Sequence, residues 1–124
     1  MIAADTSALS SYFKGEAGRA VDLVHSALLG NNICIPPVVL TELLSDPLAQ
    51  AQMEETVVGF PLLSLLEGYW ERAGHNRRLL LQMGLKAKTA DTLVAQVCID
   101  NDVLLITRDP DFRHFAKHCG LKLA

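Results

Sequence analysis

Four carboxylates stand within or at the edges of strongly apolar runs, namely Asp5, Glu42, Asp91 and Asp109. An isolated buried carboxylate is costly and several together repel one another, so ionised acids in such places usually surround a cation. Oxygen ligands without a histidine or cysteine cluster favour Mg²⁺ or Mn²⁺ over zinc. Such an ion polarises a phosphoryl oxygen and lowers the pKa of bound water, so the four residues predict a metal-dependent phosphodiester hydrolase.

Each acid also has a structural explanation that needs no metal. Asp5 can cap a following helix, Asp91 can favour a helix N-terminus through the helix dipole, and Asp109 can begin a turn before Pro110. Glu42 has the weakest explanation of this kind, because apolar residues precede it by one helical turn. One shared cation site accounts for all four acids together.

The order of apolar runs and helix signals predicts an α/β domain with a parallel sheet covered on both faces. Strands that read as continuous apolar runs alternate with amphipathic segments. We expect strands at residues 2–4, 33–35, 60–65 and 103–106, and an edge strand at 121–123. We expect helices at about 16–29, 37–44, 47–58, 67–83 and 89–99, and a helical or turn-like segment at 109–118.

This arrangement explains how the acids could meet. In an open parallel sheet the functional crevice lies beyond the carboxyl ends of the strands, and Asp5 and Asp109 each follow a predicted strand. Asp91 lies in the first turn of its predicted helix, on the same stripe as Val94 and Cys98, so its side chain should lean inward. Glu42 is expected to lean inward from its helix in the same way.

Four sequence segments on these elements resemble the PIN-domain ribonucleases, and in particular the VapC-type toxins of toxin-antitoxin pairs. The segments are Ile2–Leu9, Pro36–Leu43, Lys88–Ala95 and Leu105–Phe112. Each segment is a weak signal alone, but the four occur in the family's order and span nearly the whole chain. The resemblance implies a three-layer α/β/α PIN-like domain over residues 1–124, with a central and mostly parallel sheet.

The resemblance also implies roles for individual residues. Asp5, Glu42, Asp91 and Asp109 match the family's acidic quartet, and three supporting candidates follow, namely Thr107, Ser7 and Asp111. Ser7 stands where the family often has asparagine, and Asp111 is an additional acid. We expect Asp5 and Asp91 to hold the principal Mg²⁺ or Mn²⁺ ion, Asp109 to ligate a second ion or a water, and Glu42 to orient the attacking water. Cleavage of RNA would then leave a 5′-phosphate and a 3′-hydroxyl.

The charge of the chain is unevenly distributed, although its formal net value is only −3. Residues 1–71 carry 9 acids and 2 bases, a charge of −7, whereas residues 72–124 carry 9 bases and 5 acids, a charge of +4. The second half therefore suits a polyanion such as RNA, or is an ordinary solvated surface. Lys88 and Arg108 are the best candidates to contact the RNA backbone, because they adjoin the acidic segments.

The residues disfavour two other protein classes and leave one further role as an alternative. A haloacid-dehalogenase-like phosphohydrolase needs a second acid where Ser7 stands, and a response-regulator receiver needs paired acids after the first strand. A more serious alternative is a catalytically inactive PIN-like domain that serves as a binding or scaffold module. Four mutually repelling acids argue against it, and loss of RNA cleavage in EDTA would separate an active enzyme from such a module.

The length of 124 residues suits one domain, and half of the residues are hydrophobic. The chain has no apolar run long enough for a membrane span and no signal-peptide pattern, so we expect a cytoplasmic protein. Three widely spaced cysteines suggest neither disulfides nor zinc. The family resemblance implies a small antitoxin partner and a homodimer, for which Leu62, Leu63, Leu65, Leu66 and Leu79–Leu81 are candidate contacts.

Overall fold

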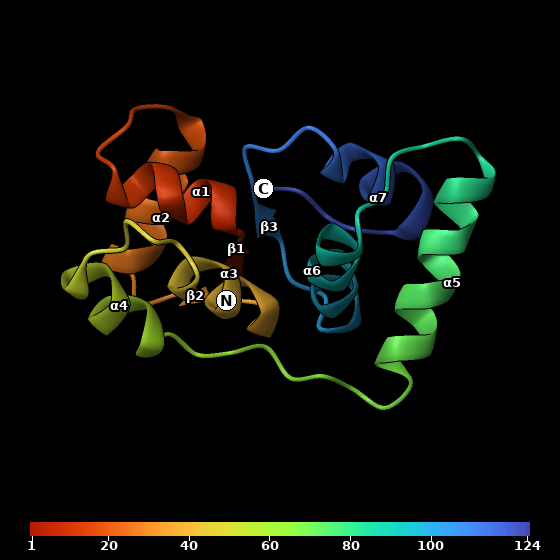
Figure 1. The fold of residues 1–124 in the computed structure, drawn as a ribbon, viewed down its shortest axis with the longest axis horizontal. Helices are drawn as coiled ribbons and strands as arrows, with labels where there is room; N and C mark the ends of the chain where they lie inside the picture. Colours follow the sequence, from red (N-terminus) through yellow and green to blue (C-terminus); the bar gives the residue numbers. More distant parts are fainter.

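Three short parallel strands form the centre of the computed structural model, which describes residues 1–124 (Figure 1). The order in the sheet is β2 (Ile33–Cys34), β1 (Ile2–Ala4) and β3 (Leu105–Ile106). Ala3 pairs with Cys34 on one side and with Leu105 on the other. Because β1 is the central strand, Ala3 and Ala4 are completely buried, and the residue that follows them is held firmly at the end of the sheet.

Seven helices surround the sheet. Figure 1 shows α1 (Thr6–Phe13) and α2 (Arg19–Leu29) on one side, and α5 (Tyr69–Gln82), α6 (Thr89–Asp100) and α7 (Phe112–Cys119) on the other. The remaining helices are α3 (Pro37–Leu44) and α4 (Ala51–Val58). The predicted three-layer α/β/α arrangement with a parallel sheet is therefore confirmed. None of the helices is both long and apolar enough to cross a lipid bilayer.

Two predicted strands are much shorter than expected. The segment 60–65 pairs only through a bridge between Leu62 and Ile35, and the segment 121–123 only through a bridge between Leu123 and Leu105. Pro61 has no N–H to donate, so the first segment accepts from Ile35 through the Pro61 carbonyl and returns a single bond from Leu63. Both bridges lie at the outer edges of the sheet and extend it in the parallel sense.

Two of the helices that begin later than predicted have a clear local cause. The helix expected from residue 47 begins at Ala51, because Asp46 accepts the Leu48 N–H with its side chain (2.9 Å) and the Ala49 N–H with its carbonyl (3.0 Å). These bonds form a turn that competes with helix formation. The helix expected from residue 16 begins at Arg19, after Gly18 adopts a φ of 139°, which other residues rarely reach.

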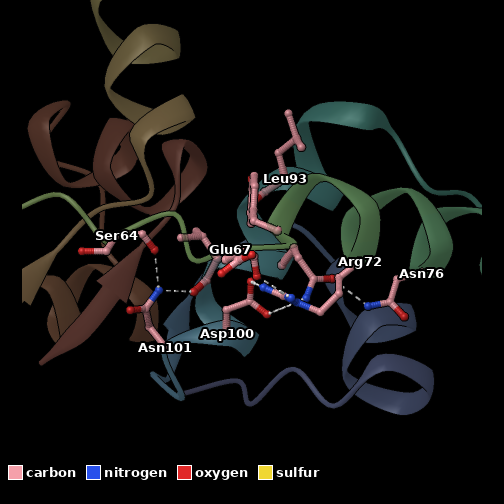
Figure 2. Close-up of polar contacts among 10 residues, drawn as sticks. Ser64, Glu67, Arg72, Asn76, Leu93, Asp100 and Asn101 are labelled. Atoms are coloured by element: carbon pink, nitrogen blue, oxygen red, sulfur yellow. Dashed lines mark hydrogen bonds and ion pairs between the residues drawn. The ribbon is translucent and has the colours of Figure 1, made fainter.

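Helix α6 carries Asp91 near its N-terminus and is fixed at its other end by a polar network with α5 (Figure 2). Asp100 accepts two hydrogen bonds from the Arg72 guanidinium, at 3.0 and 2.7 Å, and one from Gln96 at 2.9 Å. Gln96, which is only 2% exposed, in turn accepts from Asn76. The network holds α5 and α6 in one register, and α6 therefore presents Asp91 at a fixed place.

The Asp100 carboxylate should contribute measurably to stability. The hydrogen bond from Arg72 holds its pKa below the usual value, so the contribution is present above the unfolded pKa and is lost as pH falls through the folded one. Asp100→Asn should cost about 1 to 2 kcal/mol of unfolding free energy in urea at pH 7, with part of the ion pair screened by solvent. The matched change Asp102→Asn, in an exposed pair with Lys122, should cost less than about 0.5 kcal/mol. Equal losses in the two variants would contradict this role of the network.

Candidate metal centre

Asp5 lies at the carboxyl end of β1 and caps α1. Its side chain is 4% exposed and accepts hydrogen bonds from the Ala8 N–H (2.9 Å) and from the Ser7 and Thr107 hydroxyls. Burial raises the pKa of Asp5, those three donors oppose the shift, and the nearby Asp109 adds to it. Asp5 therefore directly follows a strand at the carboxyl end of the sheet, which is the position that the sequence predicted for it.

Ser7 and Thr107 join the first turn of α1 to the loop that follows β3. Their hydroxyl oxygens are 3.4 Å apart, and the Arg108 N–H donates to Ser7 Oγ at 3.0 Å. Thr107 Oγ1 also accepts the Asp109 N–H at 3.0 Å. These contacts fix the backbone that carries Asp109 relative to Asp5, which is a positioning task suited to both hydroxyls.

Asp91, Asp109 and Asp111 come together from two different parts of the chain. One carboxylate oxygen from each lies within 4.8 Å of the others, and all three residues are half-buried. Asp109 Oδ1 accepts the Asp111 N–H at 2.9 Å, so the loop before α7 presents both acids to Asp91 on α6. The predicted association of Asp91 with Asp109 is seen in this geometry, whereas Asp5 lies outside the three-acid set.

No hydrogen-bond donor in the structure compensates for the burial of the Asp91 carboxylate. Its Oδ2 atom is buried and is the only buried side-chain polar atom without a hydrogen-bond partner in the structure. Burial is the largest cause that raises the pKa of Asp91 to about 6, and the negative charge of Asp109 is the next. Asp111 and Glu42 raise this pKa further, whereas the positive charge of Lys88 lowers it. An orphaned carboxylate oxygen among other acids is what a hard divalent cation would satisfy, so the donor set fits Mg²⁺ or Mn²⁺.

Glu42 differs from expectation in one respect. It is exposed on α3 rather than directed into the packed side, and it accepts the Thr6 hydroxyl at 2.8 Å. Thr6 adjoins Asp5, and the Glu42 carboxylate contributes to the raised pKa of Asp91, so Glu42 lies at the rim of the acidic group. The turn of α3 that carries it follows Pro37, which opens that helix.

The two predicted RNA-binding bases differ in their surroundings. Arg108 turns away from the acids, because its guanidinium donates to Ser11 Oγ at 2.7 Å and to Glu16 at 3.2 Å. Lys88 is exposed at the start of α6 and makes no ion pair, but its charge acts on Asp91. Contact of Arg108 with RNA would require it to leave Glu16, whereas Lys88 is already free.

Two contacts at the site were not foreseen from the sequence. Lys86 forms an ion pair with Asp111 at 3.3 Å, and Thr6 binds Glu42. No local pattern signals either pair, because each joins residues from different elements. Asp111 itself was a predicted candidate, and its N–H donates to the carboxylate of Asp109 two positions earlier, as in an Asx turn.

Comparison with known proteins gives the family. The model of the PIN domain family matches residues 2–118, and the chain therefore belongs to the PIN domain family. No curated protein matches the sequence significantly.

Solved structures with a similar fold include chains of three VapBC complexes. VapBC2 from Rickettsia felis, bound to a DNA fragment from its promoter, has a TM-score of 0.74 at 22% identity and covers 100% of this chain and 98% of that one. VapBC-5 from Mycobacterium tuberculosis, of the VapBC family of toxin-antitoxin systems, has a TM-score of 0.72 at 21% identity, with coverage of 98% and 95%. DNA-bound VapBC from Salmonella typhimurium has a TM-score of 0.73 at 18% identity, with coverage of 100% and 98%. At these identities the likeness establishes the fold.

The pKa of Asp91 makes stability depend on pH in a predictable direction. Between about pH 4 and 6 the folded protein binds more protons at Asp91 than the unfolded chain does, so metal-free stability should fall as pH rises through this window. Asp91→Asn should flatten that decline and be the more stable protein at pH 7, as measured by urea unfolding in chelator. Asp22→Asn, an exposed acid on α2, serves as the control and should keep the parental slope. An unchanged slope in Asp91→Asn would show that the carboxylate is not strained by its surroundings.

Proposed function

We propose that this protein is a Mg²⁺- or Mn²⁺-dependent endoribonuclease of the VapC type, acting as the toxin of a toxin-antitoxin pair. Membership of the PIN domain family and the fold shared with VapBC chains support the proposal. The observation that carries it is the buried, partnerless Asp91 oxygen beside two further carboxylates. An inactive scaffold would gain nothing from keeping that unfavourable group.

We assign the ion to Asp91 and Asp109, with Asp111 as a further candidate ligand. Both Asp5 oxygens already accept hydrogen bonds from the protein, so its first task is to hold the loops after β1 and β3 together. Whether Asp5 also ligates the ion, as its sequence motif predicts, stays a prediction. When bound, the ion supplies Lewis-acid polarisation of a phosphoryl oxygen and a lower pKa for water.

The remaining polar groups have tasks that do not depend on ligation. Glu42, which accepts the Thr6 hydroxyl at the rim, would orient the attacking water by accepting a hydrogen bond from it. Lys88 offers an exposed ammonium at the start of α6, where it can contact an RNA phosphate. In-line attack on phosphorus would break the bond to the 3′ oxygen and leave a 5′-phosphate.

Cleavage of a generic RNA tests the enzymatic part of the proposal. The parent protein should cut RNA in Mg²⁺ or Mn²⁺ and stop when EDTA is added. Asp109→Asn should lower the rate at least about a hundredfold while folding normally, because it removes a candidate ligand. Asp22→Asn is the matched control and should cut at the parental rate. If Asp109→Asn cuts as fast as the parent, or if EDTA has no effect, the assignment is wrong and the scaffold alternative gains support.

We also propose a small antitoxin as partner, because the structural relatives are described as VapBC complexes. The chain offers a groove of about 750 Å³ between α1, the end of α2 and the α3–α4 region, whose lining includes Tyr12 and Phe13 from α1 and Met53 from α4. Leu48 at its edge is 86% exposed, which is unusual for a leucine without a partner. An amphipathic helix with apolar anchors suits a surface of this kind.

A homodimer and a cytoplasmic location remain predictions. Among the predicted dimer contacts, Leu62, Leu65, Leu79 and Leu81 are between 41% and 48% exposed, but Leu80 is completely buried and belongs to the core of the monomer. Trp70, 63% exposed, adjoins Leu65 at a hollow of about 240 Å³ beside α3 and α6. The patch of Trp70 and Leu65 is a better candidate for a contact between two copies than Leu80 is.

Expression in a bacterial host tests the toxin and its partner. The chain alone should arrest growth, Asp91→Asn should not, and co-expression of the small open reading frame adjacent to its gene should restore growth. Leu48→Asp should remain toxic but be rescued less well, because an aspartate places a charge in the apolar groove. Growth arrest by Asp91→Asn equal to that of the parent would contradict toxicity through RNA cleavage, and full rescue of Leu48→Asp would contradict the groove as the docking site.

A further inference from the structure

Lys86 makes the only ion pair within the three-acid group. Its Nζ lies 3.3 Å from Asp111 Oδ2, and the two side chains are 59% and 24% exposed. Asp111 stands before α7 but does not cap it with its side chain, and the ion pair with Lys86 is the one polar contact of its carboxylate. The ammonium is thus the sole partner of that carboxylate.

The backbone around Lys86 is held on both sides. The Leu85 N–H donates to the Leu80 carbonyl at 3.0 Å, and the Ala87 carbonyl accepts from Arg77 Nε at 2.8 Å. Ala87 is buried, and Leu80 belongs to the core. Lys86 is therefore presented over Asp111 by an anchored loop, and only its side chain needs to move to release the carboxylate.

The charges around the three acids also distinguish Lys86 from Lys88. With three carboxylates and one ammonium, two negative charges stay uncompensated, which is the charge of one divalent ion. Lys88 acts on Asp91, whereas Lys86 contacts Asp111. The two lysines of the α5–α6 loop therefore serve different acids.

We propose that Lys86 is an internal competitor of the divalent ion, whose ammonium withholds Asp111 from ligation and so weakens metal binding at the three-acid group. The inference rests on the proposed metal centre and adds a regulator of it. The ion must either bind through Asp91 and Asp109 alone or displace Lys86 to gain Asp111. Because the Lys86 side chain is largely exposed and solvent screens its contact with Asp111, the competition is modest and easily reversed.

Calorimetric titration of the metal-free protein with Mn²⁺ alone tests this role without any RNA. Lys86→Met should bind Mn²⁺ roughly two- to fivefold more tightly than the parent, since the competing ammonium is absent. Lys86→Arg should keep the parental affinity. Lys122→Met removes the other exposed lysine pair, with Asp102, and is the matched control that should leave affinity unchanged.

A double-mutant cycle with Asp111→Asn separates competition at Asp111 from a general effect of charge. If Lys86 acts through Asp111, the gain from Lys86→Met should disappear in the Asp111→Asn background. If the gain persists there, the lysine acts only through long-range repulsion of the ion, and the proposal is wrong. Unchanged or weaker Mn²⁺ binding by Lys86→Met in the parental background would overturn it as well.

The outcome is independent of catalysis. A protein that binds Mn²⁺ as expected but cuts no RNA would refute the proposed activity and leave the role of Lys86 standing. If the parent cuts RNA but Lys86→Met binds Mn²⁺ like the parent, the proposed activity stands and the role of Lys86 is refuted. In an active enzyme, Lys86→Met should also reach half-maximal cleavage at a Mn²⁺ concentration two- to fivefold lower than the parent needs.

Discussion

Repulsion among carboxylates held at one end of the sheet is the constraint on which the rest of this structure depends. Asp91, Asp109 and Asp111 approach within 4.8 Å, and Asp91 keeps a buried oxygen without a partner. Such an arrangement is unfavourable in the metal-free protein, so packing elsewhere must hold it in place. A divalent ion would convert the same repulsion into ligation, which links the stability of the fold to its proposed chemistry.

The fold supplies that packing at two places. The parallel neighbours β1 and β3 end together, and the Ser7 and Thr107 hydroxyls join the first turn of α1 to the loop after β3. The partly buried network of Arg72, Asp100 and Gln96 fixes α6 against α5 at the end of α6 remote from Asp91 (Figure 2). The acids are therefore positioned by elements whose own stability owes nothing to a metal.

Much of this arrangement could be predicted because its signals are local. The apolar run before Asp5, the proline that opens α3 and the strand before Asp109 predicted most of the helices and strands in their order, but the helix α1 was not predicted. Pairings between distant elements left no such signal, and so the Lys86–Asp111 pair and the exposure of Glu42 emerged only in three dimensions. Strand length was overestimated where Pro61 interrupts pairing, since an apolar run indicates burial rather than hydrogen bonding.

The central claim is that the acids are destabilising alone and satisfied by a hard divalent ion. Its most direct test is the unfolding midpoint of the protein in chelator and then in excess Mn²⁺, measured at pH 7 for the parent and for Asp91→Asn. The account predicts a clear rise in the parent, because an ion that binds only the folded state stabilises it, and little or no rise in the variant. A parent whose midpoint does not respond to Mn²⁺, or a variant that responds equally, would contradict it.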